Sequence, residues 1–351
     1  MKRVLVTGGA GFVGSNLAIG IKEHFENVEV IVLDNLMRRG SELNLARLKS
    51  FGIEFKHGDV RILSDLDSVG KVDFLLECSA EPSVLAGSDG NPTYVMQTNL
   101  NGALNCAEFC RMHGAGMIFL STSRVYAIKN LCEAGIEETE KRFELSGSQS
   151  SPGISSKGIS EDCSTRGFKS FYGASKFAAE VILEEYREMF DWPVIINRCG
   201  LIAGPWQFGK ADQGIISFWL QAHMTGKNLK YIGFNGSGKQ VRDVIHIKDL
   251  TRLIILQMKK SELFKNEVFN VGGGRESSFS LLELTGLCQD VSGCKIDIGA
   301  EKKMRYADIP VYISDCERIC AHSKWKIELN IEDVVQDVYN WLQDNKDVCS
   351  L

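Results

Sequence analysis

Short apolar runs alternate with longer amphipathic stretches over the first 200 residues of the chain. Runs rich in Val, Ile, Leu and Phe have the length of buried strands. We expect strands at residues 4–7, 28–33, 53–57, 74–78, 117–121 and 194–198. Apolar residues recur at helical spacing in segments 14–25, 94–113 and 172–189. This alternation predicts an α/β fold, a doubly wound parallel sheet with helices on both faces.

The pattern changes twice along the chain. Residues 127–169 are rich in Ser, Gly, Glu and Lys and have little periodicity, which favours a substrate-covering insert over a disordered one. From about Gly200 onward, shorter elements alternate with Gly-rich turns. We therefore expect a Rossmann domain at 1–198, to which 241–260 returns, and a smaller α/β lobe at 199–351 that binds the substrate.

Composition narrows the function classes. The formal net charge of −5 argues against a nucleic-acid-binding or membrane-surface protein. No apolar run is long enough to predict a membrane helix, so we expect a cytoplasmic protein. The 11 cysteines form no C-x-x-C pair and have no histidines at ligand spacing, which favours reduced, buried thiols and no metal site.

A glycine loop follows the first expected strand directly. In Thr7-Gly8-Gly9-Ala10-Gly11-Phe12-Val13-Gly14, the first glycine of the pattern permits a tight exit from the strand. Gly11 lets the backbone approach a pyrophosphate, and Gly14 lets the helix pack closely on the sheet. The N–H groups at the start of the helix, at Phe12 and Val13, would face the anion. The motif predicts a dinucleotide site.

An acidic residue supports the same site and indicates which dinucleotide binds. Asp34 ends the second expected strand, 20 residues after Gly14, and is placed to accept hydrogen bonds from the adenosine ribose together with Asn35. A carboxylate there repels a 2′-phosphate, which favours NAD over NADP, although Arg38 and Arg39 follow closely. Asp59 and Val60 end the third strand and are expected near the adenine; a strand-end Asp can also serve only as a helix cap.

A catalytic set follows later in the chain. Tyr172 is the one tyrosine with a lysine four residues on, Lys176, so a helix places both side chains on one face. An ammonium group near a phenol lowers the pKa of the phenol, and the phenolate can then act as a base. Thr122 at the end of the fifth strand is our candidate to bind the reacting oxygen, while Ser121 and Ser123 would line the pocket beside the cofactor and the substrate.

In this order, the glycine loop, the strand-end Ser/Thr and Tyr-x-x-x-Lys resemble the extended short-chain dehydrogenases/reductases that modify nucleotide sugars. The resemblance covers nearly the whole chain. It implies that Asn99 lies near the site and that Cys78 and Ala80 line the NAD. It also implies a dimer or tetramer formed through the helices at 94–113 and 172–189.

The resemblance extends to the C-terminal lobe. The run from Gly238 to His246 is similar to the segment whose arginine, here Arg242, binds the diphosphate of a sugar nucleotide. Arg305 resembles a second such arginine, and two guanidinium groups suit phosphate oxygens. Alone, each arginine could equally be a surface ion pair.

Within this family the nearest likeness is the group of CDP-paratose (CDP-tyvelose) 2-epimerases. It rests on the stretch from Leu33 to Gly40, on Gln207-Phe208 with the nearby Asp212-Gln213-Gly214, and on the run around Arg242. The resemblance implies a tightly bound NAD, a nucleotide-diphosphate sugar as substrate, and Gln207 as a substrate contact.

Three other functions remain as alternatives. A UDP-sugar 4-epimerase would share the same triad, but Leu201 stands where those enzymes carry an asparagine. A 4,6-dehydratase would carry Asp-Glu after the threonine, where this chain has Ser123 and Arg124. A non-catalytic NAD sensor or scaffold would not need the intact triad.

Overall fold

A computed structural model describes residues 1–88, 90–210 and 213–349, so Asp212 of the predicted substrate stretch lies outside the described residues. The chain divides into two compact units. Unit 1 comprises residues 1–125, 171–198 and 250–269, and unit 2 comprises residues 126–170, 199–249 and 270–351. The insert that sequence analysis counted with the first domain therefore belongs to unit 2.

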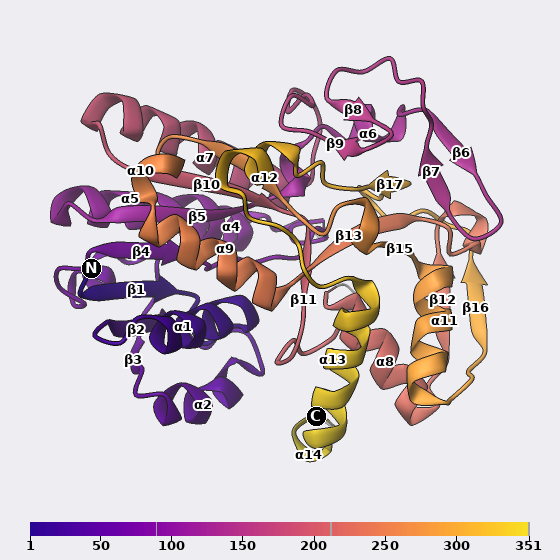
Figure 1. The fold of residues 1–351 in the computed structure, drawn as a ribbon, viewed down its shortest axis with the longest axis horizontal. Coiled ribbons are helices and arrows are strands. Elements are labelled where there is room, and N and C mark those ends of the chain that lie inside the picture. Colours follow the sequence, from indigo (N-terminus) through magenta and orange to yellow (C-terminus); the bar gives the residue numbers. More distant parts are fainter. Residues whose placement is uncertain (89, 211–212, 350–351) are drawn as a thin grey trace. The chain divides into compact units, whose positions relative to one another are not determined.

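A seven-stranded sheet in the order β14-β10-β5-β4-β1-β2-β3 organises unit 1 (Figure 1). Its strands are β1 (Arg3–Thr7), β2 (Glu29–Asp34), β3 (Glu54–His57), β4 (Phe74–Glu77), β5 (Gly116–Thr122), β10 (Val194–Cys199) and β14 (Val268–Val271). The strand β1 pairs in parallel with β2 and β4, β2 with β3, and β4 with β5. The predicted fold class is confirmed.

Helices cover both faces of this sheet. They are α1 (Phe12–His24), α2 (Asn44–Ser50), α3 (Leu63–Asp67), α4 (Thr93–Met96), α5 (Gly102–His113), α7 (Phe171–Phe190), α9 (Ile247–Lys259) and α10 (Ser261–Phe264). Helices α5 and α7 pack against β4 and β5. Helix α1 lies against α9 so closely that a Cβ on Gly20 would meet Thr251 at 2.3 Å.

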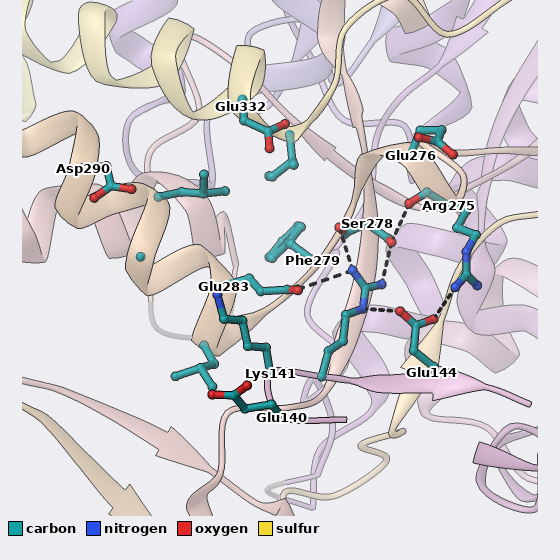
Figure 2. A pocket seen from close by; sticks show the side chains of 15 residues that line it. Glu140, Lys141, Glu144, Arg275, Glu276, Ser278, Phe279, Glu283, Asp290 and Glu332 are labelled. Carbon is teal, nitrogen blue, oxygen red and sulfur yellow. Dashed lines mark hydrogen bonds and ion pairs between the residues drawn. The ribbon is translucent and has the colours of Figure 1, made fainter. Parts of the chain in front are cut away.

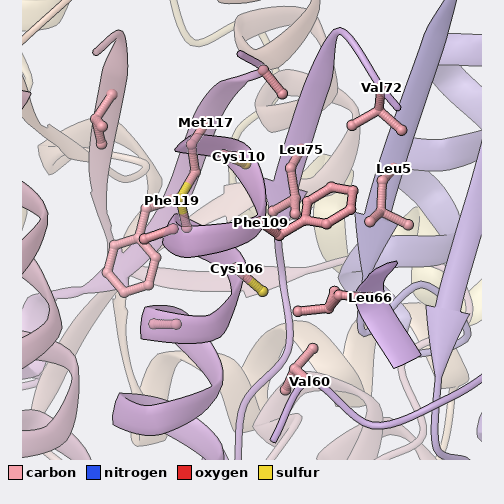
Figure 3. Close-up of a cluster of buried hydrophobic side chains, with 14 of the residues drawn as sticks. Leu5, Val60, Leu66, Val72, Leu75, Cys106, Phe109, Cys110, Met117 and Phe119 are labelled. Carbon is pink, nitrogen blue, oxygen red and sulfur yellow. The ribbon is translucent and has the colours of Figure 1, made fainter. Parts of the chain in front are cut away.

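The core of unit 1 lies between the sheet and the helices α5 and α7 (Figure 3). Alternate side chains of the strands, such as Leu5, Leu75 and Phe119, belong to one buried cluster with Phe109 of α5. Cys106 and Cys110 point into the same cluster and are free thiols, like every other cysteine whose side chain is described. These two cysteines act as small apolar side chains, as predicted, whereas Cys132 and Cys294 are exposed.

The sheet differs from the expectation near its β14 edge. The segment β13 (Val241–His246) pairs with strands of unit 2, and β14 takes the edge position beside β10. Only the following helix, α9, returns to unit 1, from Leu250 onward. The apolar pattern of residues 241–246 predicts a buried strand but does not specify which sheet that strand joins.

Unit 2 is built around a smaller sheet in the order β11-β13-β15, with β17 also paired to β13. Its remaining strands form two-stranded pairs. The strands of unit 2 are β6 (Ile136–Glu138), β7 (Phe143–Leu145), β8 (Ile154–Ser155), β9 (Gly158–Ile159), β11 (Leu201–Ala203), β12 (Leu229–Ile232), β13, β15 (Ser278–Ser280), β16 (Ile298–Glu301) and β17 (Val311–Tyr312). Its helices are α6 (Ile128–Cys132), α8 (Ile215–Thr225), α11 (Leu281–Ser292), α12 (Glu317–Ser323), α13 (Ile331–Asp344) and α14 (Lys346–Cys349). Helices α8, α11 and α13 pack together over the core of this unit.

Residues 127–169 form an ordered part of unit 2. They contain α6 and the antiparallel pairs β6–β7 and β8–β9. Arg142 anchors the segment: it donates hydrogen bonds to the carbonyl and the hydroxyl of Ser278 and forms ion pairs with Glu144 and Glu283. These residues line a cavity of about 740 Å³ in unit 2 (Figure 2). None of the site residues predicted from the sequence lines it.

Candidate functional site

The predicted cofactor residues lie at the carboxyl ends of five neighbouring parallel strands of unit 1. The glycine loop follows β1, Asp34 ends β2, Asp59 follows β3, Cys78 follows β4 and Ser121 lies at the end of β5. In the sheet these strands stand in the order β5-β4-β1-β2-β3. Ligands of open α/β sheets bind at this edge, so the topology gathers residues that are distant in sequence.

The glycine loop has no room for side chains at its key positions. Gly8 has φ +61°, and a Cβ there would lie 2.8 Å from the Cys78 carbonyl oxygen. A Cβ on Gly14 would lie 2.3 Å from the Gly8 carbonyl oxygen. Gly11 is the N-cap of α1, and no side chain caps this helix end. The first N–H groups of α1, at Phe12 and Val13, therefore belong to an open helix N-terminus that suits a phosphate group.

Asp34 is tied to the glycine loop by its carboxylate. Oδ2 accepts a hydrogen bond from the Ala10 N–H at 3.1 Å, and Oδ1 accepts one from the Leu36 N–H at 2.8 Å. Burial raises the pKa of Asp34, whereas these N–H groups act to lower it. The loop thus holds the carboxylate at the end of β2, where the sequence predicts the ribose contact.

Asn35 and Asp59 form a second polar connection between strand ends. The Asn35 amide donates to Asp59 Oδ2 at 2.9 Å, and Arg61 donates to both oxygens of the same carboxylate. The Arg61 guanidinium lowers the pKa of Asp59 to about 2. Val60 is buried, and its carbonyl oxygen accepts from Asn105 at 2.8 Å. Asp59 is thus an ionised carboxylate beside the predicted adenine position.

Asn99 supports the segment that follows β4. It lies in the π-helical turn η2 (Gln97–Asn101), and its side chain both accepts from the Glu81 N–H at 2.8 Å and donates to the Glu81 carbonyl at 3.1 Å. It also donates to Ser175 Oγ on α7 at 3.2 Å. This side chain therefore links the stretch that carries Cys78 and Ala80 to the helix that carries the predicted catalytic pair.

The predicted triad belongs entirely to unit 1. Thr122 is buried at the end of β5, and its Oγ1 accepts from the Arg124 N–H at 3.2 Å. Tyr172 and Lys176 stand one turn apart in α7, with Tyr172 partly exposed and Lys176 buried. Helix α7 packs against β5. The structure thus places a hydroxyl, a phenol and an ammonium group on two packed elements, and their joint action at one reacting centre remains a prediction.

Sequence reasoning missed three buried charged residues around this triad. Glu77 at the end of β4 lies 3.2 Å from the ammonium nitrogen of Lys176. Glu180 on α7 accepts a hydrogen bond from the Ser121 hydroxyl and is paired with Arg198 of β10 at 2.7 Å. A carboxylate one turn after Lys176 on α7 was the one available signal for Glu180; no sequence pattern pointed to Glu77. Since the Ser121 hydroxyl donates to Glu180, a cofactor role for Ser121 remains a prediction.

Three of the four predicted substrate residues lie in unit 2. Arg242 on β13 donates to Asp308 Oδ1 at 2.8 Å, and burial lowers the pKa of its guanidinium. Arg305 is exposed. The Gln207 amide donates to the Ile202 carbonyl, while its Oε1 is buried without a hydrogen-bond partner among the described residues. Ser123 begins the short 3₁₀ turn after β5 in unit 1. Their roles remain predictions.

The residues of unit 1 fit a bound NAD. The glycine loop leaves backbone exposed where a Cβ would fill the space, and the start of α1 has uncapped N–H groups for a pyrophosphate. An acidic side chain lies at the end of β2 for the ribose. Among the described residues, no group of three or more side chains is arranged to hold a metal ion. No helix in the described ranges has the length and apolarity that a membrane crossing requires.

Comparisons with known proteins agree with this site. A model of the NAD dependent epimerase/dehydratase family matches residues 4–272. The chain is 31% identical to CDP-paratose 2-epimerase of Salmonella typhi, over 97% of this chain and 98% of that protein. It is 26% identical to a putative UDP-glucose 4-epimerase of Methanocaldococcus jannaschii, over 97% and 99% of the two chains.

A solved structure shows the same fold. The UDP-glucose 4-epimerase of Thermus thermophilus in complex with NAD has a TM-score of 0.77 at 23% identity, covering 98% of this chain and 99% of that one. With the matched family model, the predicted cofactor NAD and the predicted class of enzyme are confirmed. The chain belongs to the NAD dependent epimerase/dehydratase family.

Proposed function

We propose that the protein is a 2-epimerase of a CDP-linked sugar, acting on CDP-paratose and CDP-tyvelose. The full-length similarity to CDP-paratose 2-epimerase, at 31% identity, is the observation that carries this proposal.

We place the enzyme in the cytoplasm, because the free thiols of this chain are typical of that compartment.

The residues of unit 1 would perform the acid–base part of the reaction. Tyr172, as a phenolate, takes the proton from the sugar hydroxyl at C2. Lys176 lowers the pKa of that phenol and Thr122 holds the reacting oxygen. The glycine loop and Asp34 would hold NAD, which when bound would supply hydride acceptance from C2 and hydride return to the keto sugar, so that the reaction is redox-neutral.

Residues of unit 2 would bind the nucleotide part. Arg242 and Arg305 supply the positive charge for the diphosphate, and the buried, unpaired Oε1 of Gln207 suits a hydroxyl donor of the substrate. Ser123, directly after Thr122, is our candidate for a further sugar contact. The glycine loop and Asp34 would have to hold NAD through the whole cycle, because loss of the cofactor after the first half would leave the sugar oxidised.

A UDP-sugar 4-epimerase is the second candidate, since relatives of that name are 26% identical over nearly the whole chain. A 4,6-dehydratase is disfavoured because the two positions after Thr122 are Ser123 and Arg124, without the acid pair that elimination of water requires. A non-catalytic protein would have no need for a Thr/Tyr/Lys set at the end of the sheet.

A product assay separates these candidates. The purified protein is incubated with CDP-paratose, and in parallel with UDP-glucose, and the products are identified by NMR. We expect conversion of the CDP sugar at C2, and a loss of turnover of about 10²–10⁴-fold in Tyr172→Phe with NAD still bound. Conversion of UDP-glucose alone would replace the proposal with the 4-epimerase, and full activity of Tyr172→Phe would refute the catalytic assignment.

A further inference from the structure

Lys176 has a buried countercharge that the family motif does not contain. Its Nζ lies 3.2 Å from Glu77 Oε2, and the two side chains are 2% and 1% exposed. Glu77 is the last residue of β4, beside Thr7 of β1 and Phe119 of β5 in the sheet register. The lysine Nζ also lies 3.9 Å from the centre of the Phe119 ring. The ammonium group is thus held by a carboxylate and an aromatic face.

The elements packed against α7 carry other titratable groups. They include the buried thiol of Cys106 and the carboxylate of Glu108 on α5, Tyr94 on α4, and Arg124 in the turn after β5. On α7 itself, Glu180 is one turn beyond Lys176 and is already paired with Arg198. Glu77 is therefore the carboxylate in contact with the catalytic lysine within the described part of the chain.

A fixed negative charge raises the pKa of every titrating group near it, because it stabilises the protonated form of each. The carboxylate of Glu77 is the countercharge of the Lys176 ammonium group in this buried position. The same charge opposes the lysine's effect on Tyr172, because the phenol experiences the ammonium together with its countercharge. The strength of the base would then depend on three residues, of which the family motif names two.

We propose that Glu77 is a positioning residue that holds Lys176 charged at the end of β4 and thereby sets the pH range in which Tyr172 is the active base. This inference rests on the proposed role of Tyr172 and adds a residue outside the motif. It predicts that removal of the Glu77 charge lowers the pKa of Tyr172.

The test titrates Tyr172 directly and needs no substrate. The phenolate absorbance of the NAD-loaded enzyme is followed against pH, and the curve of Tyr172→Phe is subtracted to isolate one tyrosine. The same subtraction is made for Glu77→Gln, using the double variant Glu77→Gln/Tyr172→Phe. We expect the midpoint to fall by about one unit in Glu77→Gln. An unchanged midpoint would overturn the proposal.

Two further variants test whether the shift of the Tyr172 midpoint comes from the charge of Glu77 or from a change in the shape of its side chain. Glu77→Asp keeps a negative charge near Lys176, so its midpoint should stay within a few tenths of a unit of the wild type. Glu180→Gln removes an equally buried carboxylate of α7 that lies about 12 Å along the helix axis from Tyr172, and it should shift the midpoint much less than Glu77→Gln. Equal shifts in Glu77→Gln and Glu180→Gln would contradict a specific role of Glu77.

A pH–rate profile on the converted sugar gives the second readout. In Glu77→Gln both limbs of the profile should move to lower pH, whereas a variant that is merely less well folded loses rate without a shift. If no nucleotide sugar is converted, the proposed function fails while the Tyr172 titration still decides the role of Glu77.

A double-mutant cycle of stability tests the proposal even if Glu77→Gln folds poorly. Denaturation midpoints are measured for the wild type, Glu77→Gln, Lys176→Met and the double variant. Glu77→Gln should lower the midpoint when Lys176 is present and should not lower it when Lys176 is methionine. The same loss in both backgrounds would show that the two side chains do not act on one another, and would overturn the proposal.

Discussion

Asp59, beside the predicted adenine position, makes the stability of the fold depend on pH. Its carboxylate is 13% exposed and receives two hydrogen bonds from the Arg61 guanidinium, which lowers its pKa to about 2. Because the pKa of Asp59 is lower in the folded state than in the unfolded state, its carboxylate contributes its full stabilisation of the fold above the unfolded pKa, near 4. This contribution disappears as the pH falls through 2.

We therefore expect Asp59→Asn to lower the free energy of unfolding by about 2 kcal/mol at pH 7. The difference from the wild type should shrink between pH 4 and pH 2. Urea denaturation at several pH values measures it, and a difference that stays constant down to pH 2 would contradict the ion pair as its source.

Asp34 provides the second residue-scale prediction. Its carboxylate bonds the loop and is placed for the adenosine ribose, so Asp34→Asn should weaken NAD binding about tenfold or more. The same change removes the charge that repels a 2′-phosphate, so the preference for NAD over NADP should fall. Calorimetry with both dinucleotides measures the two effects, and an unchanged preference would refute the assigned role.

At the residue scale, the sequence predicted the local motifs but not the tertiary contacts. The glycine loop, Asp34 and the Tyr172/Lys176 pair have fixed sequence spacings that follow from strand and helix geometry. The contact between Glu77 and Lys176 joins residues 99 positions apart, so it depends on the packing of α7 over β4. No periodicity in the sequence predicts such a contact.

At the scale of elements, the start of α1 depends on the absence of a side chain. A Cβ on Gly14 would lie 2.3 Å from the Gly8 carbonyl oxygen and 2.7 Å from the Gly9 Cα, both of which are backbone atoms. Gly14→Ala should therefore cost about 1–3 kcal/mol of stability and weaken NAD binding, because α1 must move away from the loop.

Gly286 of α11 is the matched control for this change. It is also a helical glycine, but a Cβ there would meet nothing within 4 Å. Gly286→Ala should raise the free energy of unfolding by about 0.5–1 kcal/mol. Thermal denaturation compares the two variants, and similar effects at both glycines would argue against the steric explanation.

Long helices and strands were predicted from their hydrophobic pattern more accurately than short ones. The seven buried residues of β5 and the twenty residues of α7 were recognised to within one or two positions. The segment 94–113 was expected as one regular helix and contains a π-helical turn at Asn99. The short strands of residues 127–169 were missed, because two or three residues carry no readable alternation.

At the scale of the whole molecule, α5 and α7 present apolar side chains to solvent. Met112, Val181, Met189 and Phe190 are 46%, 43%, 74% and 51% exposed. We expect the protein to be a dimer or tetramer through these helices, and Val181→Arg/Met189→Arg to yield monomers. Light scattering after gel filtration measures the mass; Met304→Arg, at a similarly exposed methionine of unit 2, is the control. A monomeric wild type would contradict the prediction.

In the proposed reaction, the hydrogen at C2 of the sugar leaves and returns within the enzyme. Incubation with CDP-paratose in deuterated water, followed by NMR of the product, tests this most directly. We predict a product inverted at C2 that carries no deuterium at that carbon. Deuterium at C2 would contradict the account, because it would mean that the carbon is deprotonated and reprotonated from solvent.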